Sequence, residues 1–244
     1  MDAKNSSTNN IPSLPRPFPQ KIIHTGSDVV LEPLSIAHVD DLWHASQDAD
    51  ASFNYLRYGP FQNKPALSRQ VEELAKRDRQ PFWAVRNIST GTVTGWLSLC
   101  DIYENDGAIE IGSIWFSPIM QRSRCSTEAV YLLMRYAMDS LRYRRLVWRC
   151  CANNLASSRA ALRYGFSPEG IWRNAIVVKG QTMDIAWFSL LRHEWPERKL
   201  AIEQWLRKEN FSAEGVALSA LTAKQPAHIP ANLPNVISRT ASTR

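Results

Sequence analysis

The sequence predicts a mixed α/β fold in which helices flank a central sheet. Short apolar strands alternate with amphipathic helices between residues 29 and 208. Three of the strands follow one another with only turn signals between them, which implies an antiparallel first half. The later strands are separated by helices, so their connections cross over the sheet. We therefore expect a mixed sheet, with a ligand site where its antiparallel part becomes parallel.

The first half of the chain begins with one short strand and two helices. The apolar run over 29–31 is typical of a strand. Apolar residues at helical spacing then predict helices over 36–47 and 67–76. The residues with this spacing are Val39, Leu42, Trp43, Val71 and Leu74.

Three consecutive strands are predicted over 82–85, 93–99 and 109–116. The tripeptide Ser89-Thr90-Gly91 separates the first two strands and favours a hairpin. The tripeptide Asn105-Asp106-Gly107 is a second turn signal, placed directly before the third strand.

The second half alternates helices and strands. A helix with one apolar face follows residue 124, and a strand is predicted over 146–148. Asn154 or Ser157 could cap a short helix that ends near Tyr164, with Gly165 just past its end. Strands over 166–172 and 183–191, joined by a turn at 179–181, precede a last helix over 193–208. The apolar face of the first helix contains Val130, Leu133, Met134, Ala137 and Leu141.

The composition indicates one folded domain between two tails. Residues 1–20 are rich in Ser, Asn and Pro and are expected to be a disordered tail. Aromatic residues nearly vanish after Phe211, so 210–244 is expected to be a largely disordered C-terminal tail. The length of the remaining segment, 21–209, suits a single domain.

Charge and cysteine content exclude several classes of protein. The net charge of +6 favours acidic ligands, but the basic residues form no nucleic-acid-binding motif. The four cysteines contain no Cys-x-x-Cys pair, which argues against a zinc site and leaves free thiols in a reducing compartment. We expect no bound metal, no membrane span and no secretory signal. The expected location is cytoplasmic, with the nucleus as the alternative.

The segment over 109–128 is the most informative part of the chain. An apolar strand breaks at Ser117-Pro118, passes through a turn with two arginines, and enters a helix. The start of a helix leaves backbone N–H groups unpaired, and its dipole favours negative charge. Arginine adds permanent charge and a fork of donors suited to phosphate. We therefore expect a phosphate-bearing ligand here. Its predicted contacts are Gln121, Arg122, Ser123, Arg124, Cys125 and Ser126.

Taken together, several motifs resemble the GNAT N-acetyltransferases, and more narrowly the branch related to ribosomal-protein N-terminal acetyltransferases. The resemblance covers about residues 28 to 197, and it rests on the order and spacing of the motifs. They are Trp115-Phe116-Ser117-Pro118, Gln121-Arg122-Ser123-Arg124, Thr127-Glu128-Ala129, Asn154 with Ser157, Tyr164-Gly165-Phe166, Glu169-Gly170 with Arg173, Lys179-Gly180 with Asp184, and Glu194-Trp195-Pro196.

The resemblance implies a GNAT fold and acetyl-CoA as cosubstrate. The sheet would be mostly antiparallel, with about six to seven strands, and splayed between the strands over 109–116 and 146–148. Backbone groups of Ile114, Trp115 and Phe116 would contact the pantetheine arm and polarise the thioester. The chain departs from the common family turn, because Arg124 and Ser126 stand where glycines are usual. A glycine-poor sub-branch has a similar turn, so coenzyme binding is still expected.

The resemblance also implies a base and an acid. Glu110 is the predicted base, because it is a carboxylate in an apolar strand and relatives use a Glu there. Strict alternation would group Glu110 with Gly112, Ile114 and Phe116 on one face. A surface glutamate is the alternative, and Asp101 and Asp106 are weaker substitutes.

Asn154 and Ser157 could cap a helix, contact the pantetheine arm, or do both, with the Ser157 hydroxyl as the acid for the departing sulfur. Tyr164 is the alternative acid, although a packed tyrosine is favoured. Cys125 is not expected to act as a nucleophile, because no histidine partner is evident and direct transfer needs no cysteine. The aromatic residues over 53–61 could wall an acceptor pocket, or they could pack in the core or as a lid.

The expected function is acetyl transfer to an amine by direct attack in a ternary complex. The acceptor is left open between a protein N-terminus and a small-molecule amine. A catalytically weak module that binds coenzyme A as a sensor or scaffold is the alternative function. Nucleic acid is not an expected partner, and the chain could be a monomer or a homodimer.

Overall fold

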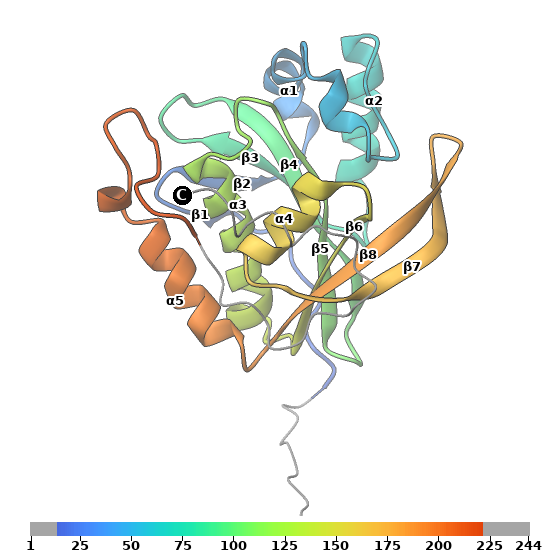
Figure 1. Ribbon diagram of the computed structural model, residues 1–244. Coiled ribbons are helices and arrows are strands. Elements are labelled where there is room, and N and C mark those ends of the chain that lie inside the picture. The colour runs from blue at the N-terminus through green and yellow to red at the C-terminus, as the bar shows by residue number, and fades with distance from the viewer. Residues whose placement is uncertain (1–13, 222–244) are drawn as a thin grey trace, which may run out of the picture.

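In the part of the chain that the structure describes, the strands form one eight-stranded sheet in the order β1-β2-β3-β4-β5-β6-β8-β7. The computed structural model describes residues 14–221 (Figure 1). Neighbouring strands are antiparallel except β5 and β6, which are parallel. This confirms the predicted mixed sheet with an antiparallel first half. The strands are β1 (His24–Thr25), β2 (Val29–Pro33), β3 (Phe82–Asn87), β4 (Val93–Tyr103), β5 (Ala108–Phe116), β6 (Arg145–Cys151), β7 (Ser167–Val178) and β8 (Gln181–Leu191).

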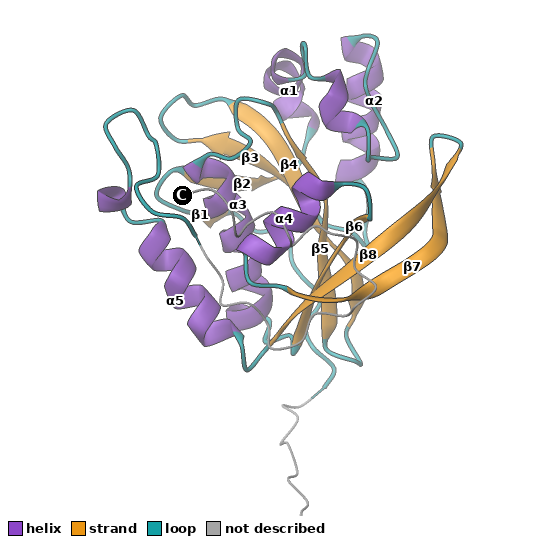
Figure 2. Ribbon diagram, in the orientation of Figure 1, coloured by secondary structure: helices purple, strands orange, loops and turns teal. Residues whose placement is uncertain are grey.

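Within residues 14–221, five α-helices and four shorter helical turns lie between the strands or follow the last of them (Figure 2). The predicted order of helices and strands is confirmed, and the short strand β1 is an addition. The helices are α1 (Val39–Ala45), α2 (Lys64–Ala75), α3 (Arg124–Arg135), α4 (Leu155–Arg163) and α5 (Trp195–Trp205), and the turns are η1 (Ile36–His38), η2 (Asp50–Phe53), η3 (Tyr136–Ser140) and η4 (Lys208–Asn210).

Helix α2 begins one turn earlier than the apolar spacing predicts. The side-chain oxygen of Asn63 accepts the N–H of Ala66 at 2.9 Å, which caps the first turn. Pro65 fits that turn because the N–H that it lacks would have no partner inside the helix. The pair of Asn63 and Pro65 was therefore a readable start signal that the apolar spacing alone missed.

The two faces of the sheet bury two separate cores. Trp83 and Val85 of β3 point to the face that α3 covers. Their neighbours Phe82 and Ala84 point to the opposite face, where α1 and α2 pack. This alternation follows from the two-residue period of a strand. Helices therefore cover both faces of the sheet.

The hairpin of β7 and β8 ends in a tight turn formed by Lys179 and Gly180. Their φ angles of 48° and 79° are both positive. Two-residue hairpin loops favour this backbone because its twist matches that of the flanking strands. Figure 1 shows the hairpin projecting from the sheet on the side of α2.

The described parts of the two predicted tails make tertiary contacts. The N–H of Arg16 donates to the carbonyl of Glu104 at 2.9 Å, and the Arg16 side chain is buried. Phe211 packs edge-on against Trp205, and Leu221 joins the core. The rest of both tails lies outside the described residues, so the proposed domain boundaries stay a prediction. Within residues 14–221 no helix has the length and apolar character needed to cross a membrane.

Candidate functional site

Strands β5 and β6 run side by side only at their beginnings. The parallel pairing joins Ala108 to Arg145 and ends with Glu110 opposite Val147. Beyond that point, among the described strands, β5 pairs with β4 alone and β6 with β8 alone. The facing edges over 111–116 and 148–151 therefore carry backbone groups without a ladder partner. This is the divergence expected between the strands over 109–116 and 146–148.

A β-bulge at Ser113 interrupts β5 within the diverging part. Gly112 faces Ser98 of β4, and Trp115 faces Trp96, so two residues of β5 oppose Leu97 alone. Ser113 has a φ of 50°, which is uncommon for a residue other than glycine. An extra residue of this kind reverses the faces of all residues that follow it.

The predicted grouping of Glu110 with Ile114 and Phe116 on one face is wrong. Ile114 and Phe116 pack against the core below α3, whereas Trp115 lies in the core below α1 and α2. The bulge is the physical reason, because it restarts the alternation after Gly112. Glu110 and Gly112 share the α1–α2 side of the sheet with Trp115.

Gln80 holds the bulge in place through a small network of polar groups. Its side-chain amide donates to the hydroxyls of Ser98 at 3.0 Å and Ser113 at 2.9 Å. The hydroxyl of Ser98, which is fully buried, donates to the carbonyl of Gly112 at 2.9 Å. Sequence reasoning missed these residues, because no local pattern marks a glutamine as the partner of two serines from other strands.

Glu110 is a buried carboxylate at the last position where β5 still pairs with β6. Its side chain is 7% exposed. Burial raises the pKa of Glu110 to about 7, because removing a carboxylate from water disfavours its charged form. The predicted alternative of a surface glutamate is therefore wrong for this residue. A carboxyl with a pKa near 7 can exchange a proton at neutral pH.

Two neighbouring groups lower the pKa of Glu110 and so oppose the effect of its burial. Arg149 of β6 forms an ion pair with Glu110, and the thiol of Cys100 donates a hydrogen bond to it. Asp101 also pairs with Arg149, and its negative charge raises the pKa of Glu110 further. The ring of Trp187 lies 4.9 Å from the Arg149 guanidinium carbon. Glu110, Asp101 and Trp187 thus hold the Arg149 side chain in place. Sequence reasoning did not identify Arg149 as part of the site.

Asn154 and Ser157 lie at the start of α4, where capping was one predicted role. The side-chain oxygen of Asn154 accepts the N–H of Ser157 at 3.1 Å. The Ser157 hydroxyl accepts the indole N–H of Trp148 at 3.0 Å, and it also forms a hydrogen bond with the Cys150 side chain. Tyr164 is buried with its ring 5.9 Å from that of Trp148, which fits the packing role favoured for it.

The turn over 121–126 leads into α3 through a side-chain cap. The Ser123 hydroxyl accepts the N–H of Ser126 at 3.1 Å. The Gln121 amide donates to the carbonyl of Phe116 at 2.9 Å, which ties the turn to the end of β5. Arg122 is exposed and has a φ of 59°. We call residues 121–126 the phosphate turn.

Arg124 and Cys125 occupy the first two positions of α3, whose N–H groups have no partner inside the helix. The Arg124 guanidinium has other partners than the predicted phosphate, since it donates to the carbonyl of Leu206 and pairs with Asp28. The Cys125 thiol accepts from the Asn87 amide at 3.4 Å, and burial raises its pKa. A raised pKa disfavours the thiolate, in agreement with the expectation that Cys125 is no nucleophile.

The aromatic segment over 53–61 packs partly in the core and partly at the surface, and its role as the wall of an acceptor pocket stays a prediction. Phe53 is buried, stacks on Trp115 at 4.9 Å, and therefore belongs to the core. Tyr55 is exposed, and its hydroxyl donates to the carbonyl of Asn153 before α4 at 3.3 Å. The Lys179 ammonium donates to the carbonyl of Phe53 at 2.9 Å, which ties the segment to the β7–β8 hairpin. The segment thus spans from α4 to that hairpin on the side of the sheet that holds Glu110.

Within residues 14–221 no group of three or more His, Cys, Asp or Glu side chains comes together that could hold a metal ion.

Comparisons with known proteins agree with this architecture. Residues 28–167 match the family described as the acetyltransferase (GNAT) domain. The chain is 41% identical to a GCN5-related N-acetyltransferase of Brucella melitensis, with a TM-score of 0.83 over 86% of this chain and 96% of that structure. A structure of the microcin C7 self-immunity acetyltransferase MccE, in complex with acetyl-CoA and AMP, shares the fold at 20% identity. Its TM-score is 0.61, over 68% of this chain and 93% of MccE.

A curated relative matches over part of its length. It is Bacillus subtilis YdaF, whose provisional name is ribosomal N-acetyltransferase, and it is 29% identical over 109 residues. That match covers 45% of this chain and 59% of YdaF, which is less than two thirds of the relative. The family match covers more than half of the chain and includes the β5–turn–α3 segment that first suggested it. The chain therefore belongs to the GNAT acetyltransferase family.

Proposed function

We propose that the protein transfers the acetyl group of acetyl-CoA to a primary amine, by direct attack of the amine within a ternary complex. The observation that carries this proposal is Glu110, a buried carboxyl with a pKa of about 7 at the point where β5 and β6 diverge. An amine attacks a thioester only through its neutral lone pair, so a base with a pKa near the working pH accelerates the reaction. Family membership supports acetyl-CoA as the donor.

The phosphates of acetyl-CoA would bind at the phosphate turn. The N–H groups of Arg124 and Cys125 begin α3 and point along the positive end of its dipole. Arg122, which is exposed, would add charge from the same turn. Ser123 and Ser126 hold the turn in shape through their mutual hydrogen bond. In this chain the side chain of Arg124 supports the turn and the backbone meets the phosphate.

The pantetheine arm would lie along the free edge of β5. Backbone groups of Ile114, Trp115 and Phe116 lie past the last pairing with β6, so they can bind an extended ligand as another strand would. A backbone N–H aimed at the thioester carbonyl would stabilise the oxyanion that forms during attack. The bulge at Ser113 sets the direction of these groups, because it rotates the strand between Gly112 and Trp115.

Ser157 would protonate the departing thiolate. Its hydroxyl accepts from Trp148, and its proton would turn from the Cys150 side chain to the departing sulfur. Asn154 fixes the start of α4 and therefore the place of Ser157. Protons would then pass from the amine to Glu110 and from Ser157 to the sulfur, so that both products are neutral. Transfer of the proton from Glu110 back to Ser157 through solvent would restore both groups.

A protein N-terminus is the acceptor that we favour, because the name of YdaF assigns a ribosomal acceptor to that relative. The test is mass spectrometry of acceptor mixtures incubated with acetyl-CoA. Peptides with a free N-terminus are compared with the same peptides carrying a blocked N-terminus, and with small amines. Acetylation of the free peptides alone supports our choice, and acetylation of small amines alone contradicts it. Saturable binding of acetyl-CoA with no acetylated product would favour the coenzyme sensor instead.

A further inference from the structure

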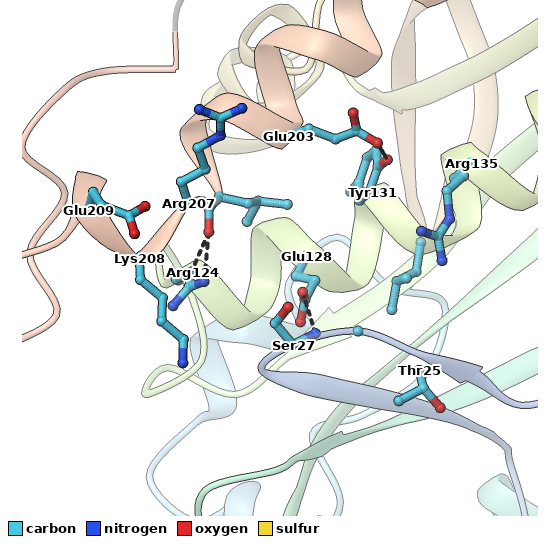
Figure 3. A pocket seen from close by; sticks show the side chains of 13 residues that line it. Thr25, Ser27, Arg124, Glu128, Tyr131, Arg135, Glu203, Arg207, Lys208 and Glu209 are labelled. Carbon is cyan, nitrogen blue, oxygen red and sulfur yellow. Dashed lines mark hydrogen bonds between the residues drawn. The ribbon is translucent and has the colours of Figure 1, made fainter.

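The Arg124 side chain joins three segments that are distant in the sequence. Its Nε and Nη2 atoms both donate to the carbonyl of Leu206, at 3.0 and 2.6 Å. Nε also lies 3.1 Å from Oδ2 of Asp28, just before β2. The guanidinium carbon lies 5.0 Å from the ring of Phe211. Figure 3 shows Arg124 reaching from α3 to the end of α5 along one wall of a surface pocket.

The partners of Arg124 suit a guanidinium better than any other side chain. Leu206 is the C-cap residue directly after α5, so its carbonyl lies at the negative end of the helix dipole. Asp28 adds a full negative charge, and Phe211 offers the face of its ring. The Arg124 side chain is only 17% exposed, so these contacts are shielded from water. A planar fork can satisfy all three at once, whereas a lysine ammonium is a single point charge.

A second connection runs parallel to the first. Arg163, at the end of α4, donates to the hydroxyl of Thr127 at 3.1 Å, and its guanidinium carbon lies 4.5 Å from the ring of Trp205. The hydroxyl of Thr127 in turn donates to the carbonyl of Ser123 at 3.1 Å. Trp205 of α5 is thus linked through two side chains to the residue that caps α3.

The segment beyond α5 completes the arrangement. The indole N–H of Trp205 donates to the carbonyl of Ser219 at 2.9 Å. Phe211 meets the ring of Trp205 edge-on at 5.0 Å, and Leu221 is buried in the core. Residues 205–221 therefore fold back onto the first turn of α3. We call them the C-terminal brace.

We infer that Arg124 is a positioning residue, through which the C-terminal brace sets the shape of the phosphate turn and so the affinity for acetyl-CoA. This inference rests on the proposed function, because it takes the ligand of the turn to be the coenzyme. The side chain occupies a place where GNAT turns commonly have a glycine. A glycine lets the turn adapt to the pyrophosphate, whereas here the turn is held from behind by α5.

The coupling works in both directions. If the brace favours the binding conformation of the turn, bound acetyl-CoA stabilises the brace by the same free energy. Hydrogen exchange of the unmodified protein measures this directly. We expect acetyl-CoA to slow amide exchange in residues 205–221 as well as in the phosphate turn. Slowed exchange confined to the phosphate turn and the β5 edge would overturn the inference.

Two substitutions test the brace without touching the proposed ligand. Phe211→Ala removes the ring over Arg124, and Asp28→Asn removes its ion pair. We expect each to weaken acetyl-CoA binding about fivefold or more, as measured by titration calorimetry. The matched control is Lys199→Met, which breaks an ion pair with Asp139 farther towards the start of α5. It disturbs the docking of the same helix and should leave the affinity unchanged.

The substitution Arg124→Lys distinguishes a role of Arg124 in positioning the turn from direct contact of its side chain with phosphate. A lysine keeps the positive charge, so if Arg124 attracted phosphate through its charge, the affinity would fall little and would depend strongly on salt. If Arg124 instead positions the turn, the lysine lacks the forked donors that hold the C-terminal brace. The substitution should then weaken acetyl-CoA binding as much as Phe211→Ala does. Normal affinity in Phe211→Ala and Asp28→Asn would overturn the inference while leaving the proposed function intact. Failure of the unmodified protein to bind acetyl-CoA would instead overturn the proposed function.

Discussion

Arg149 on β6 forms an ion pair with Glu110 on β5, at the point where the two strands cease to pair. Burial and the charge of Asp101 raise the pKa of Glu110, whereas Arg149 and Cys100 lower it. The balance leaves the carboxyl at a pKa of about 7. A base with this pKa is partly ionised at neutral pH, so small changes in its surroundings should alter the pH dependence of turnover.

The substitution Arg149→Met should move the acidic limb of the pH profile to higher pH. Loss of the positive charge leaves burial and Asp101 to raise the pKa of Glu110 above about 7. The base is then protonated over a wider range, so kcat/KM rises only at higher pH. The control is Arg145→Met on the same strand, because Arg145 pairs with Glu169 instead. An unshifted limb in Arg149→Met would show that Arg149 does not control the base.

The substitution Asp101→Asn should shift the same limb in the opposite direction. The negative charge of Asp101 raises the pKa of Glu110, so its removal should lower that pKa. Turnover would then reach its plateau at lower pH than in the unmodified protein. Measuring kcat/KM across pH for both variants makes a paired test. Shifts of the same sign in the two variants would contradict the electrostatic explanation.

Gly112→Ala should slow turnover while leaving acetyl-CoA binding intact. A methyl group at Gly112 would lie 2.8 Å from Oε1 of Glu110 and 3.0 Å from the sulfur of Cys100. The carboxylate must then move away from its present position. A displacement of about 1 Å in a reacting group can cost about a hundredfold in rate. We therefore expect kcat to fall about tenfold to a hundredfold. A normal kcat would mean that the position of this carboxylate does not limit the reaction.

The folded protein should lose stability relative to Glu110→Gln as the pH rises from 4.5 to about 7. The pKa of Glu110 is raised on folding, so between these values the folded state holds a proton that the unfolded state has released. The stabilisation is fully present below the unfolded pKa and is lost as the pH rises through the folded one. Each pKa unit corresponds to about 1.4 kcal/mol, which gives a difference of about 3 kcal/mol. Urea unfolding of both proteins across this range measures it, and parallel stability curves would refute the assignment.

Ser157→Ala should lower kcat more than it weakens acetyl-CoA binding. Loss of the hydroxyl removes the proposed acid for the leaving thiolate, and general acid catalysis contributes about a hundredfold or more. Ser158→Ala is the control, because that neighbouring hydroxyl lies 3.4 Å from the sulfur of Cys150. Equal effects of the two substitutions would indicate that both serines act only through the packing of α4.

Much of the fold could be read from the sequence, because its strands and helices have clear local signals. The apolar stripe of α3 and the glycine after Tyr164 lie where these patterns predict. Glu110 was singled out because it is a carboxylate in an apolar strand and because relatives use a Glu there, and its role as base stays a prediction. The bulge at Ser113 was not predicted. It depends on Gln80 and Ser98, which come from other parts of the chain, and nothing near Ser113 announces it.

The two arginines show where local reasoning fails. Arg124 was predicted to bind phosphate because its neighbours form a helix start, yet its guanidinium contacts Leu206, which is 82 positions farther along the chain. Arg149 carries no local signal that marks it as a site residue, yet it is the partner of Glu110. The direction of a long charged side chain depends on which segments the fold brings near it, and that information is not local.

The central claim is that Glu110 is the base in acetyl transfer, and the substitution Glu110→Gln tests it most directly. Acetyl-CoA affinity is measured by calorimetry. The value of kcat/KM is measured across pH on an acceptor with a free amine that the unmodified protein acetylates. We predict unchanged affinity, a fall in kcat/KM of about a hundredfold or more, and loss of the pH limb near 7. If Glu110→Gln kept the kcat/KM of the unmodified protein and the same pH limb near 7, the account would be contradicted.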